Sequence, residues 1–173
     1  MAQVGLVDRG GQHWMRALEA PFPWEDVEIK CQACRRNRDG NPLGLVVPYF
    51  NARSAMKRLD DIFSPECWQA EYREMHLGVT PGIICRLTVW PYSREGFSIV
   101  REDGAGVTDV EAFKGAVSSA FKRAFSALGA RSFYDLELGW WPCEADEAQK
   151  PKFKRWTKEA LAGIEKRYSE VIR

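Results

Sequence analysis

Residues 109–136, DVEAFKGAVSSAFKRAFSALGARSFYDL, place positive charge directly beside apolar side chains. Lys114, Lys122 and Arg123 are the cations within its apolar-rich part, residues 110–128. Ammonium and guanidinium groups neutralise phosphate oxygens, so a row of them can hold a nucleic-acid backbone without reading its sequence. An amphipathic helix with a solvated basic face has the same spacing, and spacing alone favours that ordinary interpretation.

Metal chemistry has weaker support. Cys31 and Cys34 have the CxxC spacing of zinc ligands, but a structural zinc site needs four ligands and no second CxxC or spaced His pair is present. Glu111 and Lys114 resemble a fragment of metal-dependent nuclease sites, yet they fall on an expected helix, where such a site would need a strand. We therefore expect no metal site.

Nucleophilic and nucleotide chemistry lack a complete motif. His13 and His76 have no nucleophile at motif distance. Gly104 and Gly106 lack the third glycine and the lysine of a phosphate loop, and the sequence contains no ATPase motif. The chain is therefore expected not to be an enzyme, and to have no catalytic residue and no cofactor.

The composition is that of a folded protein, with 45% hydrophobic and 12% aromatic side chains among 173 residues, most simply one domain. The longest apolar runs, such as residues 43–50, are too short for a membrane helix, and the first residues lack the order of a signal peptide. The five cysteines are odd in number and scattered, which fits reduced thiols better than disulfides. We expect a cytoplasmic, nucleoid-associated protein.

Charge is unevenly distributed although the net charge is only +1. Residues 151–173 contain seven Lys and Arg against three acids, a net charge of +4, which leaves −3 for the rest of the chain. This basic end is either an arm that binds a polyanion or a solvated helix or tail, and its composition favours neither.

To position the cations, residues 110–128 are expected to form a helix with an i, i+3, i+4, i+7 apolar stripe. Asp109 and Glu111 suit the positive end of its dipole, and Gly129 stands where a left-handed C-terminal cap would lie. The stripe consists of Phe113, Ala116, Val117, Ala120, Phe121, Ala124 and Leu128. Off the stripe lie Lys114, Ser118, Ser119, Lys122 and Ser126, with Arg123 at its margin.

The amino-terminal part is expected to contain two helices and a hairpin. A short helix over residues 12–19 ends at Pro21-Phe22-Pro23, and residues 28–47 form a hairpin that turns at Asp39-Gly40. Asn51 caps a second helix that reaches Phe63. The residues expected to face inward are Ala52, Ala55, Met56, Leu59 and Phe63, and those expected to face outward are Arg53, Lys57 and Asp60.

Between residues 64 and 106 the hydrophobic period changes to two. Strands are expected over residues 68–73, 83–92 and 97–101, ending at a flexible corner, residues 103–106, that leads into the long helix. The order strand, strand, strand, helix predicts an α+β domain in which the long helix covers one face of an antiparallel sheet.

These motifs together resemble the Rad fifty-two family of single-strand annealing proteins, and most closely its bacterial branch typified by DNA damage response protein A (DdrA). The resemblance covers roughly residues 20–136 and rests on the combination of motifs. These are YFNARSAMKRLD at residues 49–60, Trp68 opening a hairpin, Gly104 and Gly106, KGAV at 114–117, FKRA at 121–124 and Leu128-Gly129.

The resemblance implies the annealing-protein fold, an antiparallel β-β-β-α core, here with an additional N-terminal hairpin and flanking helices. Residues 1–150 would be the annealing domain, and 151–173 a basic C-terminal helix or tail. In the family such units assemble into rings whose groove holds single-stranded DNA. Arg53, Lys122 and Arg123 match positions whose cations line that groove, and Lys114 on the same helix is a fourth candidate. Ser126 departs from the pattern, since a further basic residue is expected there.

The function implied by the resemblance is annealing of complementary strands without ATP, in recombination and double-strand break repair. Gripping the backbone would leave the bases free to pair, unlike a platform on which bases stack. The expected partners are single-stranded DNA, further copies of the chain in a ring, and a single-strand-binding protein or recombinase, with no membrane. The alternatives are an oligomeric scaffold that protects DNA ends or binds partner proteins without annealing, and a metal-dependent nuclease.

Overall fold

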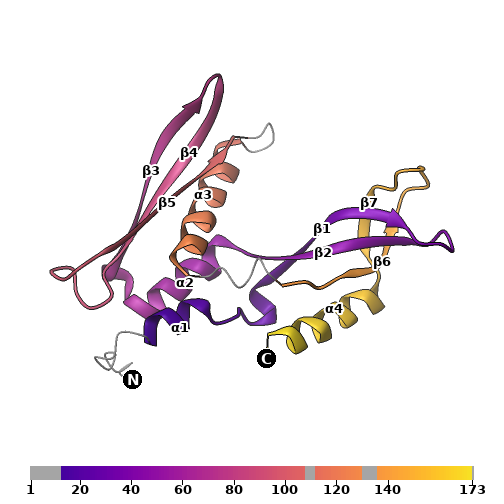
Figure 1. Ribbon diagram of the computed structural model, residues 1–173, viewed down its shortest axis with the longest axis horizontal. Coiled ribbons are helices and arrows are strands. Elements are labelled where there is room, and N and C mark those ends of the chain that lie inside the picture. Colours follow the sequence, from indigo (N-terminus) through magenta and orange to yellow (C-terminus); the bar gives the residue numbers. More distant parts are fainter. Residues whose placement is uncertain (1–12, 108–111, 130–135, 173) are drawn as a thin grey trace. The chain divides into compact units, whose positions relative to one another are not determined.

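The computed structural model describes residues 13–107, 112–129 and 136–172 (Figure 1). They form an α+β protein with antiparallel sheets and four α-helices. The elements in chain order are α1 (His13–Glu19), η1 (Trp24–Asp26), β1 (Val27–Arg36), β2 (Pro42–Phe50), α2 (Ala52–Phe63), η2 (Pro65–Cys67), β3 (Trp68–Leu77), β4 (Thr80–Val89), β5 (Ile99–Gly106), α3 (Ala112–Leu128), β6 (Trp140–Ala145), β7 (Phe153–Trp156) and α4 (Lys158–Val171).

The chain divides into two compact units. Unit 1 comprises residues 1–20 and 51–131, and unit 2 comprises residues 21–50 and 132–173. The chain therefore enters unit 2 twice. A boundary between compact units does not show where an annealing domain ends, so the division expected at residue 150 stays a prediction.

Unit 1 has the predicted strand, strand, strand, helix order. Its antiparallel sheet has the order β3-β4-β5, and α3 packs on one face of it (Figure 1). The buried core of this layer comes from alternate residues of β4 and from the apolar face of α3. Its members include Ile83, Cys85, Leu87, Val89, Ala116, Ala120, Phe121 and Ala124.

The flexible corner expected at residues 103–106 is wrong, because these residues belong to β5. Gly104 pairs with Ile84 and Gly106 with Gly82 in the antiparallel register. A Cβ atom on Gly104 would lie 3.3 Å from the Ile83 carbonyl oxygen and 3.3 Å from the Met75 sulfur. Glycine here allows close approach of neighbouring strands, and the ladder of backbone hydrogen bonds outweighs its conformational freedom.

Helix α3 matches the predicted limits where the structure describes them, while Asp109, Val110 and Glu111 lie outside the described residues. Phe113 is not part of the buried stripe, because it is 66% exposed at the open first turn. Ser126 is buried rather than solvated, and its hydroxyl donates a hydrogen bond to the Lys122 carbonyl oxygen at 2.8 Å. That internal partner removes the cost of burying the hydroxyl.

The end of α3 also differs from the prediction. Gly129 does not adopt the left-handed conformation expected of a C-terminal cap. Its N–H donates instead to the Ser126 carbonyl oxygen at 3.2 Å, a tightened last turn that needs no positive φ.

The smaller helices of unit 1 follow the local signals at their ends, but Asp60 of α2, expected to face outward, is half-buried and accepts a hydrogen bond from the Trp68 indole. Asn51 caps α2, as predicted, because its side-chain oxygen accepts a hydrogen bond from the Ser54 N–H at 2.8 Å. The inner face of α2 buries Ala55, Leu59 and Phe63. Trp14 of α1 packs on Phe63, with ring centroids 5.8 Å apart.

Unit 2 contains a second sheet, with strand order β1-β2-β6-β7. The predicted hairpin is confirmed as β1 and β2, and Gly40 supplies the positive φ of +81° in its turn. The hydrophobic period did not predict β6 or β7. Helix α4 packs on one face of this sheet, where Tyr168 donates a hydrogen bond to the Phe22 carbonyl oxygen at 2.6 Å.

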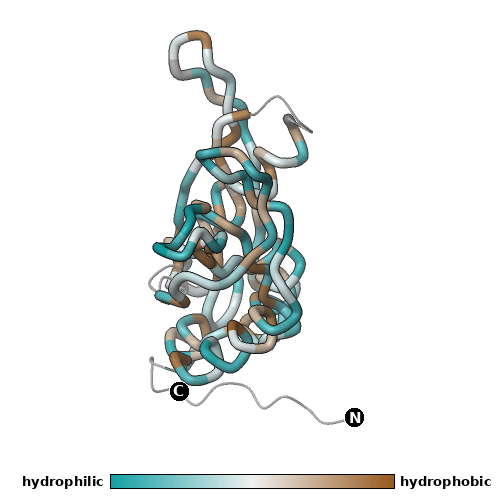
Figure 2. Tube along the Cα trace, turned by 90° about the vertical axis from the view of Figure 1, so that its right-hand side faces the viewer, coloured by the Kyte–Doolittle hydropathy of each residue, from teal (hydrophilic) through white to brown (hydrophobic). Residues whose placement is uncertain are grey.

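Apolar residues are not confined to the two cores. Figure 2 shows apolar colour at the tip of the β3–β4 hairpin, where Val79 is 97% exposed.

All five cysteines carry free thiols. No helix among the described residues is long and apolar enough to span a membrane.

Candidate nucleic-acid interface

A groove of about 320 Å³ runs between α2, β3 and α3 of unit 1. Most of its lining is apolar, and Lys114 is the cation in its wall. The residues that line it are Ala52, Met56, Tyr72, Phe113, Lys114, Val117, Ser118 and Phe121. The groove therefore combines an apolar floor with a positive charge at its wall, a surface suited to a nucleic-acid backbone and sugar.

A short chain of contacts fixes the three walls of the groove. The Trp68 indole N–H donates a hydrogen bond to the Asp60 carboxylate at 2.8 Å, which joins β3 to α2. The Trp68 ring lies 6.2 Å from the Phe121 ring, which joins β3 to α3. Asp60, Trp68 and Phe121, which belong to the sequence motifs described above, therefore hold the walls of the groove together.

The four cations predicted to bind DNA do not form one cluster. Arg53 is exposed on α2, next to Ala52 in the groove wall, and Lys114 lines the groove from α3. Lys122 is half-buried, about 12 Å further along α3 and turned by about 80° from Lys114. Arg123 is turned by about 180° from Lys114, so it projects from the opposite side of the helix.

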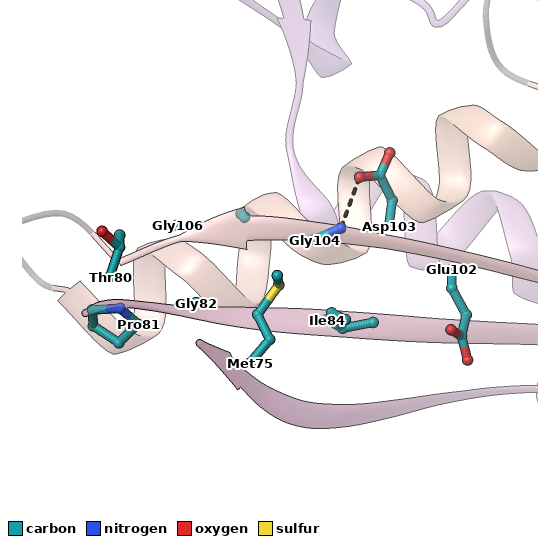
Figure 3. Close-up of a pocket in the computed structure, with 10 residues that line it drawn as sticks. Met75, Thr80, Pro81, Gly82, Ile84, Glu102, Asp103, Gly104 and Gly106 are labelled. Atoms are coloured by element: carbon teal, nitrogen blue, oxygen red, sulfur yellow. Dashed lines mark hydrogen bonds between the residues drawn. The ribbon is translucent and has the colours of Figure 1, made fainter. Parts of the chain in front are cut away.

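Arg123 faces β5, where its guanidinium Nε donates to the Asp103 carboxylate at 2.9 Å. The same Asp103 oxygen accepts a hydrogen bond from the Gly104 N–H at 2.7 Å (Figure 3). The Arg123 side chain is 58% exposed, and an exposed ion pair of this kind stabilises a fold by only about 0–1 kcal/mol. A phosphate group can therefore compete with Asp103 for Arg123 at little cost.

Ser126, where the resemblance leads one to expect a cation, does not contribute to this surface. Its side chain is buried, and its hydroxyl is bonded to its own helix. The predicted DNA-binding cations on α3 are therefore Lys114, Lys122 and Arg123, without a fourth at position 126.

Tyr72 adds a neutral polar group to the groove. Its pKa is raised to about 12, first because partial burial disfavours the phenolate and second because the Cys85 thiol lies beside it. Burial likewise raises the pKa of Cys85 to about 11. At neutral pH the phenol therefore stays protonated and does not repel a phosphate.

A larger hollow of about 400 Å³ lies on the face of the same sheet that points away from α3 (Figure 3). Met75, Gly82, Ile84 and Gly104 form its apolar floor, and Glu102 is its acidic edge. None of the described residues that line it is a cation. The smaller groove, which has a cation in its wall, is therefore the better candidate to bind a polyanion.

The described cysteines do not form a metal site. Cys34 and Cys143 of unit 2 have sulfur atoms 3.7 Å apart, and burial raises the pKa of Cys143 to about 12. No group of three or more His, Cys, Asp or Glu side chains within the described part of the chain is arranged to hold a metal.

Comparison of the sequence with known protein families identifies a match. The profile of the family described as Rad52/22 family double-strand break repair protein matches residues 12–152, most of the chain. No curated protein matches it. Proteins of the matched family are annealing proteins rather than classical enzymes, and they act in DNA double-strand break repair. The chain belongs to the Rad52/22 family of double-strand break repair proteins.

Proposed function

We propose that this protein binds single-stranded DNA along the α2–α3 groove of a ring-like homo-oligomer and anneals complementary strands without ATP. The observation that carries the proposal is the groove, with Lys114 in its wall and Arg53 beside it, in a chain of this family. Lys122 and Arg123 continue from Lys114 as a strip of cations that crosses over α3, with Arg123 on the side that faces Asp103. The annealing domain is proposed to be residues 1–150, in the DdrA branch of the family.

Cations and phosphates supply the binding energy. Each phosphate that a Lys or Arg neutralises releases counterions, which gives an affinity that does not depend on base sequence and falls as salt rises. A backbone held in this way leaves base edges free to meet a second strand. Pairing then supplies about 1.4 kcal/mol per stacked step, so ten steps outweigh the release of a few phosphates without nucleotide hydrolysis.

Assembly would complete the surface. The sheet of unit 1 has two edges, β3 and β5, and an unpaired edge is an aggregation hazard unless a neighbour or another element covers it. A head-to-tail contact that closes into a ring removes that hazard and lines the grooves of successive protomers into one path. A single-strand-binding protein or a recombinase is a further proposed partner, in the cytoplasm at the nucleoid.

A fluorescence-quenching assay tests the proposal. Purified protein is mixed with complementary oligonucleotides at low salt, without ATP or divalent metal, over a range of protein-to-nucleotide ratios. We expect faster annealing than in buffer alone, loss of that activity at high salt, and preference for single over double strands. Equal annealing rates with and without protein would favour the scaffold that protects DNA ends or binds partner proteins.

A further inference from the structure

Unit 2 presents a sheet face that none of its described helices covers. Along β2, Gly44, Val46, Pro48 and Phe50 are buried, whereas the alternate residues are half-buried. Helix α4 packs on the buried side, because Gly163 lies against Trp141, the strand partner of Gly44. The other face, called the open face here, carries Leu43, Leu45, Val47, Tyr49 and Trp140.

A β-bulge places two cations on this open face. Lys30 and Arg35 are five residues apart on β1, so regular alternation would put them on opposite faces. The register shifts between Cys31 and Ala33, which leaves one extra residue, Gln32, and reverses the alternation beyond it. Both cations therefore lie on the open face, each beside an aromatic ring.

The two cations are positioned over aromatic rings. The Lys30 ammonium lies 4.9 Å from the centre of the Tyr49 ring, and the Arg35 guanidinium lies 4.0 Å from the centre of the Trp140 ring. Both side chains are exposed, and neither forms an ion pair within the described part of the chain. Their charges are therefore available to an anionic ligand.

The spacing of the two cation–ring pairs suits a single strand. Trp140 is the strand neighbour of Leu45, and Tyr49 lies four residues further along β2, about 13 Å away. Bases stacked about 3.4 Å apart would cover that length with about four nucleotides. A guanidinium plane accepts a base on its free side while its other side rests on the indole.

The charge of the open face favours a polyanion. Its cations are Lys30, Arg35 and Arg155, and its acids are Glu28 and Glu144. Glu144 already pairs with Arg155 at 2.8 Å. Apolar, aromatic and unpaired cationic groups on one sheet face are what a platform for stacked bases requires. A duplex would hide the faces of its bases, so the fitting ligand is a single strand.

We infer that the open face of unit 2 is a second binding site for single-stranded nucleic acid, in which a base stacks on the Arg35 guanidinium above Trp140 while Lys30, held over Tyr49, and Arg35 neutralise phosphates. This site differs in chemistry from the α2–α3 groove, because it holds bases rather than leaving them free. A strand held here would be retained but not presented for pairing.

The test compares an oligonucleotide with its base-free analogue. The full chain carrying Lys122→Ala and Arg123→Ala is titrated with ten-nucleotide oligo-dT and with an abasic decamer of the same phosphate count. We expect oligo-dT to bind about tenfold more tightly, because stacking contributes only where bases exist. A parallel titration with oligo-rU shows whether the site binds RNA or DNA more tightly. Equal binding of oligo-dT and the abasic decamer would overturn the inference.

Variants then assign the preference to the open face. Trp140→Leu should remove the preference for bases, and Arg35→Gln, which changes an exposed side chain, should reduce it. Lys158→Gln with Lys166→Gln, which removes two exposed cations from α4, is the matched control and should leave the preference unchanged. A preference that survives both Trp140→Leu and Arg35→Gln would refute the site. Tighter binding of a poly-glutamate peptide than of oligo-dT would replace it with a protein-docking surface.

Discussion

At the residue scale, the cations of α3 differ in what surrounds them. Lys114 lines the groove, whereas Arg123 lies on the other side of the helix and pairs with Asp103 at 2.9 Å. Only a backbone path that passes over the helix, rather than one confined to the groove, would contact both. The predicted DNA-binding set is therefore a strip across α3, with Arg53 on α2 at its edge.

Removing charge from this strip should weaken binding and reduce its dependence on salt. With Lys122→Ala and Arg123→Ala combined, we expect lower affinity for single-stranded DNA and a salt slope flatter by about 0.7 for each phosphate that is no longer neutralised. Arg53→Ala should act in the same direction. Fluorescence anisotropy over a series of salt concentrations measures both quantities.

Lys166→Ala with Arg167→Ala is the matched control, because it removes the same Lys-Arg pair from α4 in unit 2. It should leave the salt slope of groove binding nearly unchanged. If the α3 variant assembles normally and still binds with the same affinity and slope, the assignment of the strip is wrong.

The raised pKa of Tyr72 predicts a loss of stability at alkaline pH. The folded-state pKa is about 12 and the ordinary value is 10.0, so above pH 10 the unfolded chain releases its proton first. The free energy of unfolding should therefore be flat near neutrality and fall as pH rises from about 10 towards about 12. Tyr72→Phe should reduce that fall.

Urea denaturation at several pH values between about 8 and about 11.5 checks this, a range that spans the ordinary tyrosine pKa. Cys85, with a pKa raised to about 11, contributes a decline of the same sign, so Tyr72→Phe should lessen the fall without abolishing it. An alkaline decline that is identical in the variant would show that Tyr72 is equally exposed in both states.

At the element scale, α2 forms one wall of the groove and depends on its first turn. Asn51 accepts hydrogen bonds from the Ser54 N–H at 2.8 Å and from the Ser54 hydroxyl at 3.1 Å. Asn51→Ala leaves the N–H without that partner and should lower the free energy of unfolding by about 1 kcal/mol. The midpoint of urea denaturation measures the change.

Thr157→Ala is the matched control for that substitution, because Thr157 caps α4 in the same way in unit 2. Both variants should lose similar stability, but only Asn51→Ala should weaken single-strand binding in the groove. If both variants weaken binding equally, the orientation of α2 does not determine binding in the groove.

At the scale of the whole molecule, unpaired sheet edges predict association. The three-stranded sheet of unit 1 leaves β3 and β5 without a further strand partner in the described part of the chain. We expect a closed homo-oligomer much larger than the 19.8 kDa chain. Light scattering at micromolar concentration measures its mass, and a monodisperse monomer would rule out the ring.

Much of the fold could be predicted from the sequence because its signals are local. Asp39-Gly40 specifies a tight turn, Asn51 caps the helix that follows it, and the change of hydrophobic period marks the strands of unit 1. The order of β3, β4, β5 and α3 followed from these signals. Such features depend on interactions between residues a few positions apart, so a single sequence contains the information.

Other features were decided only by the tertiary structure. Residues 103–106 form a strand because β4 supplies hydrogen-bond partners, and Phe113 is exposed because the first turn of α3 borders a groove. The separation of Arg123 from Lys114 follows from helix geometry, but the Asp103 partner that holds Arg123 comes from another element.

The open face of unit 2 separates most clearly what the sequence predicts from what the tertiary structure determines. The types of Lys30, Arg35 and Trp140 are visible in the sequence, yet a regular strand would place the two cations on opposite faces. The bulge near Gln32 and the pairing of β2 with β6 bring them together. Side-chain identity and local conformation were determined by the sequence alone, whereas which side chains meet was determined by long-range pairing, because that pairing joins segments about 100 residues apart.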